Sequence, residues 1–287
     1  MNCLFASDLH GHRGRYRRLV ERMAAEVPDL VLLGGDLLPG GWLLDAGGSG
    51  DDFAQGFLLP TFAELRGRMG GSYPRVGFIL GNDDPRAALP ELLAGEEAGL
   101  WRHLHMTALD LPGFTVLGYA CVPPSPFGLK DWERYDVSRH VDPGCLSPEE
   151  GVRTVPVDPH EIRWGTITRE LEALTTGHDP AHTVLLCHAP PYQTTLDRAA
   201  LDGRTVDHVP LDVHVGSVAL RRFIEQRQPL ATLHGHIHES ARLTGRWLDR
   251  LGGTVMISAA HDGPELALVR LDLRNPGSAT RELLPPL

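Results

Sequence analysis

Metal-binding residue types follow several short apolar runs in this sequence. Asp8 and His10 come directly after the first run, and Asp36 follows two glycines after the second. The donors are carboxylates, imidazoles and one amide oxygen, with no thiolate, which favours divalent ions such as Mn, Fe or Zn over a soft-metal or structural zinc site. The complete candidate set is Asp8, His10, Asp36, Asn82, His188, His236 and His238.

The spacing of these residues predicts that they meet at one place. In extended backbone, residues i and i+2 point the same way, so Asp8 with His10, and His236 with His238, can each aim two side chains at one cluster. Seven ligands exceed the number that one tetrahedral ion takes. A carboxylate that bridges two ions would distribute them, so the sequence predicts a binuclear centre.

The apolar runs predict the strands that position this set. Most are continuous rather than alternating, which is typical of strands covered on both faces, and helical patterns lie between the early ones, so the fold class is α/β. In an open α/β sheet, ligands bind beyond the carboxyl ends of the strands, where five of these runs deliver an Asp, Asn or His. The expected strands are 3–6, 30–33, 76–80, 115–119, 183–187, 230–233, 255–258 and 266–273.

Connections between these strands give further expectations. Tyr16, Leu19 and Met23 recur at helical spacing before Pro28, and Ser217 is expected to cap a second helix that ends before Pro229. The short Asp-Gly-Pro connection between the last two strands predicts a hairpin. We predict one domain over residues 1–287, with insertions at about 42–57, expected to be a mobile surface loop, and about 120–165, which lacks clear periodicity.

Composition excludes several function classes. The chain has 287 residues, 37 acidic and 27 basic, with a formal net charge of -10, and no block of Lys and Arg. This argues against a duplex-DNA or anionic-membrane binder, because both need clustered positive charge. The N-terminus lacks a signal-peptide pattern, and no apolar run is long enough to span a membrane. We expect Cys3, Cys121, Cys145 and Cys187 to be free thiols in a reducing cytoplasm rather than a disulfide pair or zinc site.

The motifs carry a family resemblance. In chain order, Asp-x-His, Gly-Asp, Gly-Asn-x-Asp, His and Gly-His-x-His resemble the motifs of the calcineurin-like metallophosphoesterases, over Asp8 to His238. The resemblance implies a four-layered α-β-β-α sandwich of two packed mixed sheets flanked by helices. It also implies that one ion is held by Asp8, His10, Asp36 and His238, and the other by Asp36, Asn82, His188 and His236, with Asp36 bridging.

One position departs from this family. The usual motif is Gly-Asn-His followed by an acidic residue, and that histidine helps to stabilise or protonate the leaving group. Here Asp83 takes its place, and Asp84 keeps the acidic residue. A carboxylate beside two dications has a lowered pKa and is a poor general acid. The sequence resembles a bacterial and archaeal subgroup of predicted phosphoesterases that lacks this histidine, and relatives of that kind act mainly on diesters, which favours a phosphodiesterase.

Other residues are candidates for catalysis or substrate contact. His12 could replace the missing histidine as a proton donor, or be a solvated residue behind the ligands. Arg13 and Arg86 follow motif loops and could contact phosphate, or lie at the solvated surface. Tyr192 and His214 belong to the segment that leaves the strand ends after His188, where they could contact substrate or pack within the loop.

Three more features have a structural alternative that we favour. His234 is expected to pack in the interior, and His261, in the turn before the last strand, is a minor functional candidate. The aromatic and basic stretch 123–135 could be a lid that stacks a nucleobase, but a segment packed on the sheet is the favoured interpretation.

These observations predict a cytoplasmic binuclear hydrolase of phosphate esters, in which a metal-bridging hydroxide attacks the phosphorus atom. The expected cofactor is two divalent ions, manganese first and iron, zinc or nickel as alternatives. The expected partner is a small, nucleotide-like or other phosphorylated substrate, with no membrane and no extended nucleic acid. The alternatives are a phosphomonoesterase, a nuclease or a non-catalytic scaffold. The oligomeric state does not follow from the sequence.

Overall fold

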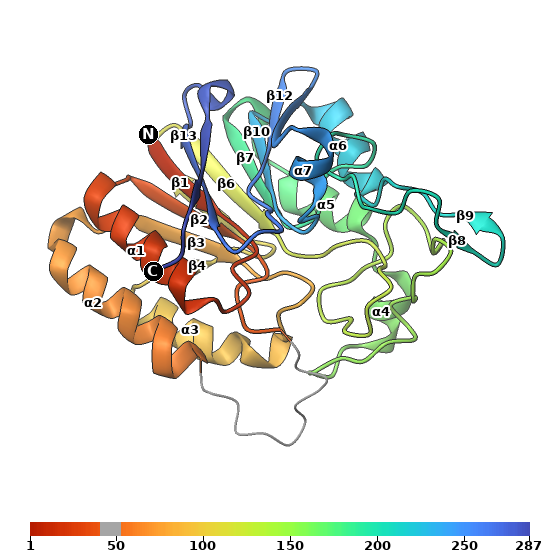
Figure 1. Ribbon diagram of the computed structural model, residues 1–287, viewed down its shortest axis with the longest axis horizontal. Coiled ribbons are helices and arrows are strands. Elements are labelled where there is room, and N and C mark those ends of the chain that lie inside the picture. The colour runs from red at the N-terminus through yellow and green to blue at the C-terminus, as the bar shows by residue number, and fades with distance from the viewer. Residues whose placement is uncertain (41–52) are drawn as a thin grey trace.

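Two six-stranded sheets form the centre of the molecule (Figure 1), and the computed structural model describes residues 1–40 and 53–287. The strands of the first sheet are β1 (Asn2–Ala6), β2 (Leu30–Gly34), β3 (Arg75–Ile79), β4 (Arg102–His103), β13 (Leu266–Asp272) and β14 (Thr280–Leu284). Those of the second are β5 (Ala108–Leu111), β6 (Phe114–Tyr119), β7 (Thr183–Cys187), β10 (Ala231–His234), β11 (Leu248–Leu251) and β12 (Thr254–Ser258). The strand orders are β14-β13-β1-β2-β3-β4 and β11-β12-β10-β7-β6-β5.

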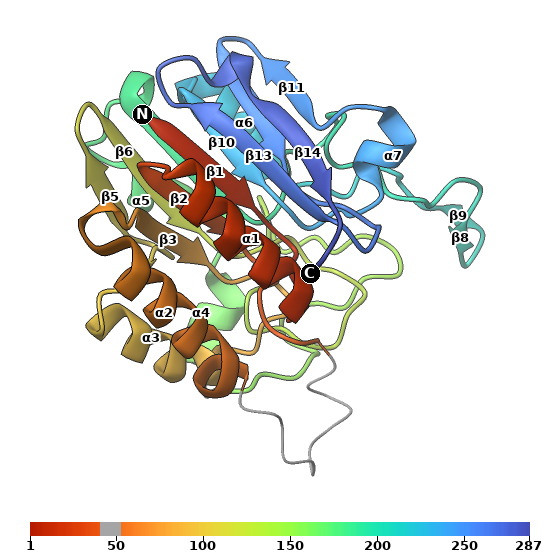
Figure 2. The same ribbon diagram turned by 60° about the vertical axis from the view of Figure 1, so that its left-hand side comes forward.

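Helices cover the outer faces of both sheets (Figure 2), so the predicted four-layered α/β sandwich is confirmed. On the first sheet lie α1 (Arg13–Glu26), α2 (Leu59–Met69) and α3 (Leu89–Glu97). On the second lie α5 (Ile167–Thr175) and α6 (Val218–Arg227). Beside these layers are α4 (Pro159–Trp164), α7 (Ser240–Thr244) and the small pair of β8 (Thr205–Val206) with β9 (Val209–Pro210).

All eight predicted strands are present. In β2, β7, β10 and β12 every residue is buried, as expected for continuous apolar runs covered on both faces. β1, β2 and β3 run parallel in one sheet, and β7 and β10 run parallel in the other. Their carboxyl ends therefore deliver the loops after β1, β2, β3, β7 and β10 to one edge, which we call the strand-end rim.

The predicted hairpin between the last two expected strands is wrong. β12 already has a neighbour on each side, β10 in parallel and β11 antiparallel, so it offers no free edge to β13. The chain instead crosses between the sheets through residues 259–265, and β13 pairs with β1 and β14. A short Gly-Pro turn does not reveal which sheet the next strand joins, because that depends on which strand edges remain free.

Both predicted helices are confirmed. α1 buries Tyr16, Leu19 and Met23 and ends at Glu26, where Val27 takes a left-handed conformation (φ 45°) and donates its N–H to the carbonyl of Met23. In α6, the Ser217 hydroxyl accepts the N–H of Leu220 (3.0 Å), which is the predicted N-cap.

The two insertions differ from one another. Residues 41–52 of the first lie outside the described part of the chain. Its end is not the expected surface loop, because Ala54–Leu58 forms a π-helical turn that leads into α2 and buries Phe57. Within the second, residues 120–158 contain no named strand or helix, as the missing periodicity predicted, and α4 follows near its end.

Within residues 1–40 and 53–287, no helix combines the length and the apolar character needed to cross a bilayer.

Candidate metal centre

Four of the seven predicted ligands lie in left-handed rather than extended backbone. Asp8, His10, Asp36 and His236 all have positive φ, at 57°, 45°, 52° and 75°. The expected extended geometry at i and i+2 is therefore wrong. Asp8 and His10 still reach the same donor group, whereas His236 and His238 reach different groups, which share Asp36. Left-handed backbone costs free energy for residues other than glycine, so the surrounding contacts must hold these turns in place.

Hydrogen bonds between the rim loops supply that restraint. Asp8 donates its N–H to the carbonyl of Gly35 (2.9 Å), and His10 donates to the carbonyl of Asp36 (2.8 Å). The fully buried Asp84 carboxylate accepts the N–H groups of Leu37 (2.9 and 3.0 Å), Leu38 (2.7 Å) and Gly81 (2.9 Å). Asp84 thus fastens the loop after β3 to the loop after β2, an anchoring role that the sequence did not reveal.

Glycines before the ligands allow this close approach. A Cβ on Gly81 would lie 2.2 Å from Oδ1 of Asp36, and one on Gly235 would lie 2.6 Å from Oδ2 of Asp8. Gly35 has φ 99°, and a Cβ there would lie 2.5 Å from Nδ1 of His188. Side chains at these positions would occupy the space where the donor atoms converge.

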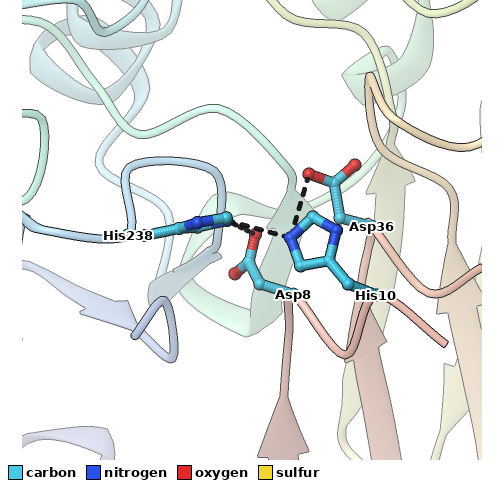
Figure 3. Close-up of side chains that lie close together, drawn as sticks. All are labelled: Asp8, His10, Asp36 and His238. Carbon is cyan, nitrogen blue, oxygen red and sulfur yellow. Dashed lines mark hydrogen bonds and ion pairs between the residues drawn. The ribbon is translucent and has the colours of Figure 1, made fainter. Parts of the chain in front are cut away.

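The first donor group contains Asp8, His10, Asp36 and His238, whose donor atoms all lie within 4.8 Å of one another (Figure 3). The Nε2 atoms of His10 and His238 are 3.1 Å apart, and Nε2 of His238 is 3.2 Å from Oδ1 of Asp8. Nε2 of His10 is 3.9 Å from Oδ2 of Asp36. Two lone-pair atoms at such close range suit a shared cation between them.

The second donor group contains Asp36, His188 and His236, again within 4.8 Å. Nε2 of His188 is 3.2 Å from Oδ2 of Asp36 and 3.2 Å from Oδ1 of Asn82, so the amide oxygen joins this group. Nδ1 of His188 lies 2.7 Å from the carbonyl of Gly34, where it must donate. That bond directs Nε2 toward the group, as partners behind metal-binding histidines usually do.

The pKa values reveal a strongly negative field at this place. Burial lowers the pKa of His188, but Asp36 outweighs it and the pKa rises to about 10. Burial likewise opposes the charge of His238, yet its bond to Asp8 and the carboxylates raise its pKa to about 9. Burial raises the pKa of Asp36, but His188 and His10 bring it below its ordinary value. The carboxylates therefore attract positive charge to this point.

The residues present fit bound cations. Asp8 is 1% exposed, and its Oδ1 accepts the backbone N–H of His236 (2.9 Å). Its Oδ2 is buried with no hydrogen-bond partner among the described residues. An unpaired buried carboxylate oxygen is costly, and a cation beside it would remove that cost. Two donor groups that share Asp36 thus form a candidate site for two divalent ions.

The sequence model of the calcineurin-like phosphoesterase family matches residues 1–240, which include every donor described above. The chain belongs to the calcineurin-like phosphoesterase family. Among curated proteins, this phosphoesterase is 37% identical over 76 residues to the uncharacterized protein MJ1162 of Methanocaldococcus jannaschii. That match covers 26% of this chain and 29% of the other protein's length.

Solved structures support the fold of this phosphoesterase. The protein TT1561 of Thermus thermophilus matches with a TM-score of 0.59 at 18% identity, over 98% of each chain. Another crystal structure matches with a TM-score of 0.61 at 17% identity, over 99% of this chain and 98% of the other. At this identity, the likeness shows a shared fold.

The two candidates for proton transfer lie near the donor groups of this phosphoesterase. Oδ2 of Asp83 is 3.7 Å from Nδ1 of His10, and Asn82 donates to Oδ1 of Asp83 (3.0 Å). Among the protein groups, burial and then Asp36 raise the pKa of Asp83. His12 is exposed at the start of α1, and burial, Arg15 and His10 lower its pKa.

The two arginine candidates both lie over aromatic rings. The Arg13 guanidinium is 5.3 Å from the centre of the Phe57 ring, and Arg86 is 5.3 Å from the Trp132 ring. Their predicted contact with phosphate stays a prediction.

Tyr192 and His214 lie together, with their ring centres 6.2 Å apart. Nδ1 of His214 is 2.8 Å from Oδ1 of the fully buried Asp197. Asp197 was missed in the sequence, where it is an ordinary Asp in a polar loop. Only its burial beside an imidazole distinguishes it.

His234 and part of the stretch 123–135 pack inside the fold, as the favoured interpretation predicted. His234 is fully buried, and its ring nitrogens lie 2.9 Å from the carbonyl of Ala189 and 2.7 Å from the Thr232 hydroxyl, which confirms its packing role. Trp132 is 1% exposed, so this part of 123–135 is packed inside rather than a stacking lid. His261 pairs with Glu265 (3.0 Å).

Arg15 is a positioning residue that no sequence pattern reveals. Its guanidinium donates to the carbonyls of Asp8 (2.8 Å), Gly263 (2.5 Å) and Pro264 (3.2 Å). It therefore ties the first ligand turn to the crossing between β12 and β13. Its partners at residues 263 and 264 are remote in sequence, so no local pattern signals the contact.

Proposed function

We propose that this protein is a two-metal hydrolase of phosphodiesters. The observation that carries the proposal is the position of Asp36, whose carboxylate belongs to both donor groups. Two-metal hydrolases hold their ions about 3.5–4 Å apart, and a shared carboxylate sets such a separation. Family membership supports a phosphoesterase in general, and the residues below support the finer choices.

Seven residues would hold the ions in this proposal. The absence of thiolate from the donor set favours manganese, with iron, zinc or nickel as alternatives. Bound there, two divalent cations would lower the pKa of a coordinated water and offset the charge of the phosphoryl oxygens. One ion would be held by Asp8, His10, Asp36 and His238, and the other by Asp36, Asn82, His188 and His236.

The chain's own hydrogen bonds hold these donors in position. The Gly34 carbonyl fixes the ring orientation of His188, and the Asp83 N–H holds Oδ1 of Asp36 (2.9 Å). The N–H of His236 fixes Asp8. Because these contacts come from rigid rim loops, little reorganisation is needed when ions and substrate bind.

The preference for diesters is proposed from Asp83. An aspartate occupies the position where the family usually has a histidine, and a carboxylate that stays ionised beside cations cannot give up a proton. Esters with good leaving groups need no such proton. Asp83 is therefore the proposed catalytic-position residue that sets this preference, and His12 is the proposed proton donor in place of the missing histidine.

A reducing cytoplasm is the proposed location, and a small, nucleotide-like phosphate ester is the proposed substrate. All four cysteines are free, and Cys3, Cys121 and Cys187 are buried, which suits a reducing compartment. The net charge of -10 supports a small substrate rather than an extended nucleic acid.

The proposal is tested by metal analysis and two chromogenic esters. Purified protein is analysed for metal by mass spectrometry, and then assayed with added manganese on bis(p-nitrophenyl) phosphate and on p-nitrophenyl phosphate. We expect two ions per chain, turnover that a chelator abolishes, and a higher kcat/KM for the diester.

Three results would contradict this proposal. Absence of both metal and turnover would indicate a binding scaffold. A higher kcat/KM for the monoester would indicate a phosphomonoesterase. Cleavage of polynucleotides alone would indicate a nuclease.

A further inference from the structure

A second polar cluster lies on the loop that follows β7, outside the two donor groups. We infer that Tyr192, Asp197, Asp212 and His214 form a subsite for a hydroxyl-bearing, sugar-like group of a phosphodiester. The inference rests on the proposed hydrolysis of phosphodiesters and adds the chemistry of the alcohol that the substrate carries.

Asp197 is the buried base of this cluster. It is 0% exposed, and its carboxylate accepts the backbone N–H groups of Gln193 (2.8 Å), Thr194 (2.9 Å) and Gly216 (3.2 Å). Both oxygens of this carboxylate thus serve as hydrogen-bond acceptors for backbone donors. The fourth contact, from His214, must therefore also be a donation.

That constraint fixes the tautomer of His214. Its Nδ1 lies 2.8 Å from Oδ1 of Asp197 and so carries the proton. In the neutral ring, Nε2 is then a lone-pair acceptor. The side chain is 30% exposed, and no described residue supplies a hydrogen bond to Nε2. Asp197 thus fixes the His214 ring through Nδ1, and Nε2 is available to accept a hydrogen bond from a ligand.

Tyr192 and Asp212 extend the same acceptor-rich surface. The Tyr192 hydroxyl donates to Oδ2 of Asp212 (2.5 Å), and its oxygen accepts the side-chain N–H of Gln193 at 3.5 Å, which leaves one lone pair for a ligand. Oδ1 of Asp212 accepts the N–H of His214 (2.9 Å). A surface with a carboxylate and two further acceptors repels a phosphate and binds donors such as hydroxyl groups. The face of the Tyr192 ring adds an apolar surface for the carbon skeleton of a sugar.

The loop that carries the cluster is tied to the strand-end rim at its start and at its middle. The carbonyl of His188 accepts the N–H of Gly235 (3.0 Å), and Ser217 donates to the carbonyl of Pro190 (2.8 Å), which closes the loop on itself. Midway, Ala200 donates to Glu239 (3.0 Å), the residue after His238. Figures 1 and 2 both place α7, which follows Glu239, against this loop. A diester whose phosphorus lies at the rim could therefore extend its alcohol toward Tyr192 and His214.

Two esters with the same leaving group test the inference. The p-nitrophenyl ester of thymidine 5′-monophosphate carries a 3′-hydroxyl, and its 3′-deoxy analogue does not. For the manganese-loaded wild type, we expect a KM about fivefold lower for the hydroxyl-bearing ester, the effect of one hydrogen bond. In His214→Ala this difference in KM should vanish. Removal of the 3′-hydroxyl and removal of the imidazole abolish the same hydrogen bond, so their effects are not additive.

Controls separate recognition from folding. Tyr192→Phe keeps the ring and removes the hydroxyl, so it should reduce the difference between the esters in part. His208→Asn changes another histidine of the same loop, at φ 68°, where Asn is tolerated, and should leave the difference intact. Metal content of two ions per chain in each variant shows that the rim is preserved.

The inference is overturned if His214→Ala affects both esters equally, which would make the residue a brace for the loop. It is also overturned if only kcat falls, which would assign His214 to proton transfer. If the wild type cleaves no diester, the proposed function fails. The subsite is then tested separately, by the binding of thymidine and of 3′-deoxythymidine. The ¹⁵N signal of Nε2 in His214 should shift with thymidine and not with 3′-deoxythymidine, and an equal response would overturn the subsite.

Discussion

The strand-end rim and the inserted segment 120–165 both bury many charged groups, but they arrange them in opposite ways. In the inserted segment, the buried charged side chains of Lys130, Asp131 and Arg134 have hydrogen-bond partners, although Nε1 of the neutral Trp132 has none among the described residues. Lys130 donates to Glu133 (2.6 Å) with both side chains fully buried, and Asp131 accepts the N–H groups of Arg86 (2.7 Å) and Thr154 (2.9 Å). At the rim, carboxylate oxygens and imidazole nitrogens instead converge on one place, and Oδ2 of Asp8 has no partner among the described residues.

The difference separates a site from an architectural network. A satisfied network holds the fold together and has no donor or acceptor left for a ligand. Convergent carboxylate oxygens and imidazole nitrogens are unfavourable unless a cation joins them, so they indicate binding. Counting polar residues does not distinguish the two regions, because both are rich in them.

The largest expected effect comes from removing the carboxylate that both donor groups share. Asp36→Asn should reduce diester turnover by at least about 1,000-fold, since it withdraws charge from both proposed ions at once. Metal analysis should show fewer than two ions per chain. Asp29→Asn, at the opposite end of the first sheet, is the matched control. Retained turnover of Asp36→Asn in manganese-replete buffer would contradict the shared role.

The next largest effect is on stability and tests the hydrogen-bonded charges that are buried in the inserted segment. Lys130→Met should lower the free energy of unfolding by about 3 kcal/mol, because it leaves the buried Glu133 without its partner. Adding Glu133→Gln should restore part of that loss, since no buried charge then remains. Denaturant unfolding measures both, and turnover per folded molecule should change little. A large loss of turnover at full stability would make this pair part of the site.

A pH effect of intermediate size comes from His105, packed 5.0 Å from the ring centre of Trp132. Burial, then His103, lowers the pKa of His105 to about 3, so the fold holds the neutral ring. The unfolded chain takes up a proton below about pH 6.5, so this stability is complete above that pH and is lost as the pH falls toward 3. Between about pH 7.5 and pH 5 the loss from this group is about 2 kcal/mol.

His105→Gln isolates this contribution, because Gln can accept the Ala120 N–H that Nδ1 of His105 accepts (3.1 Å) but does not titrate. Unfolding free energies across this range should fall less steeply with acid than in the wild type. The exposed His140→Gln should follow the wild type. Equal slopes for wild type and His105→Gln would show that His105 does not contribute.

The smallest expected effect concerns Asp83. Asp83→His should raise kcat by about tenfold on esters with poor leaving groups, since an imidazolium can donate the proton that a carboxylate cannot. Esters of p-nitrophenol should change little because their leaving group needs no proton. A series of aryl and alkyl diesters measures this, and an equal effect across the series would argue against proton donation at residue 83.

Much of the fold was predictable because a continuous apolar run in the sequence predicts a strand that is buried on both faces. The eight expected strands, the end of α1 before Pro28 and the Ser217 cap of α6 depend on local sequence. Short edge strands such as β4 and β11 were missed, since none of their residues is buried. The hairpin was wrong because strand pairing depends on which edges other strands have already occupied.

The order of the five motifs by itself determined the family, the strand-end position of the ligands and the unusual Asp83. Those features are local, because a residue type after a buried run is visible in the chain. Tertiary structure alone decided that the ligand turns are left-handed, that Arg15 and Asp84 hold them, and that Asp197 turns His214 outward. These depend on contacts between distant segments, whose energies arise only when the two sheets and their loops have packed together.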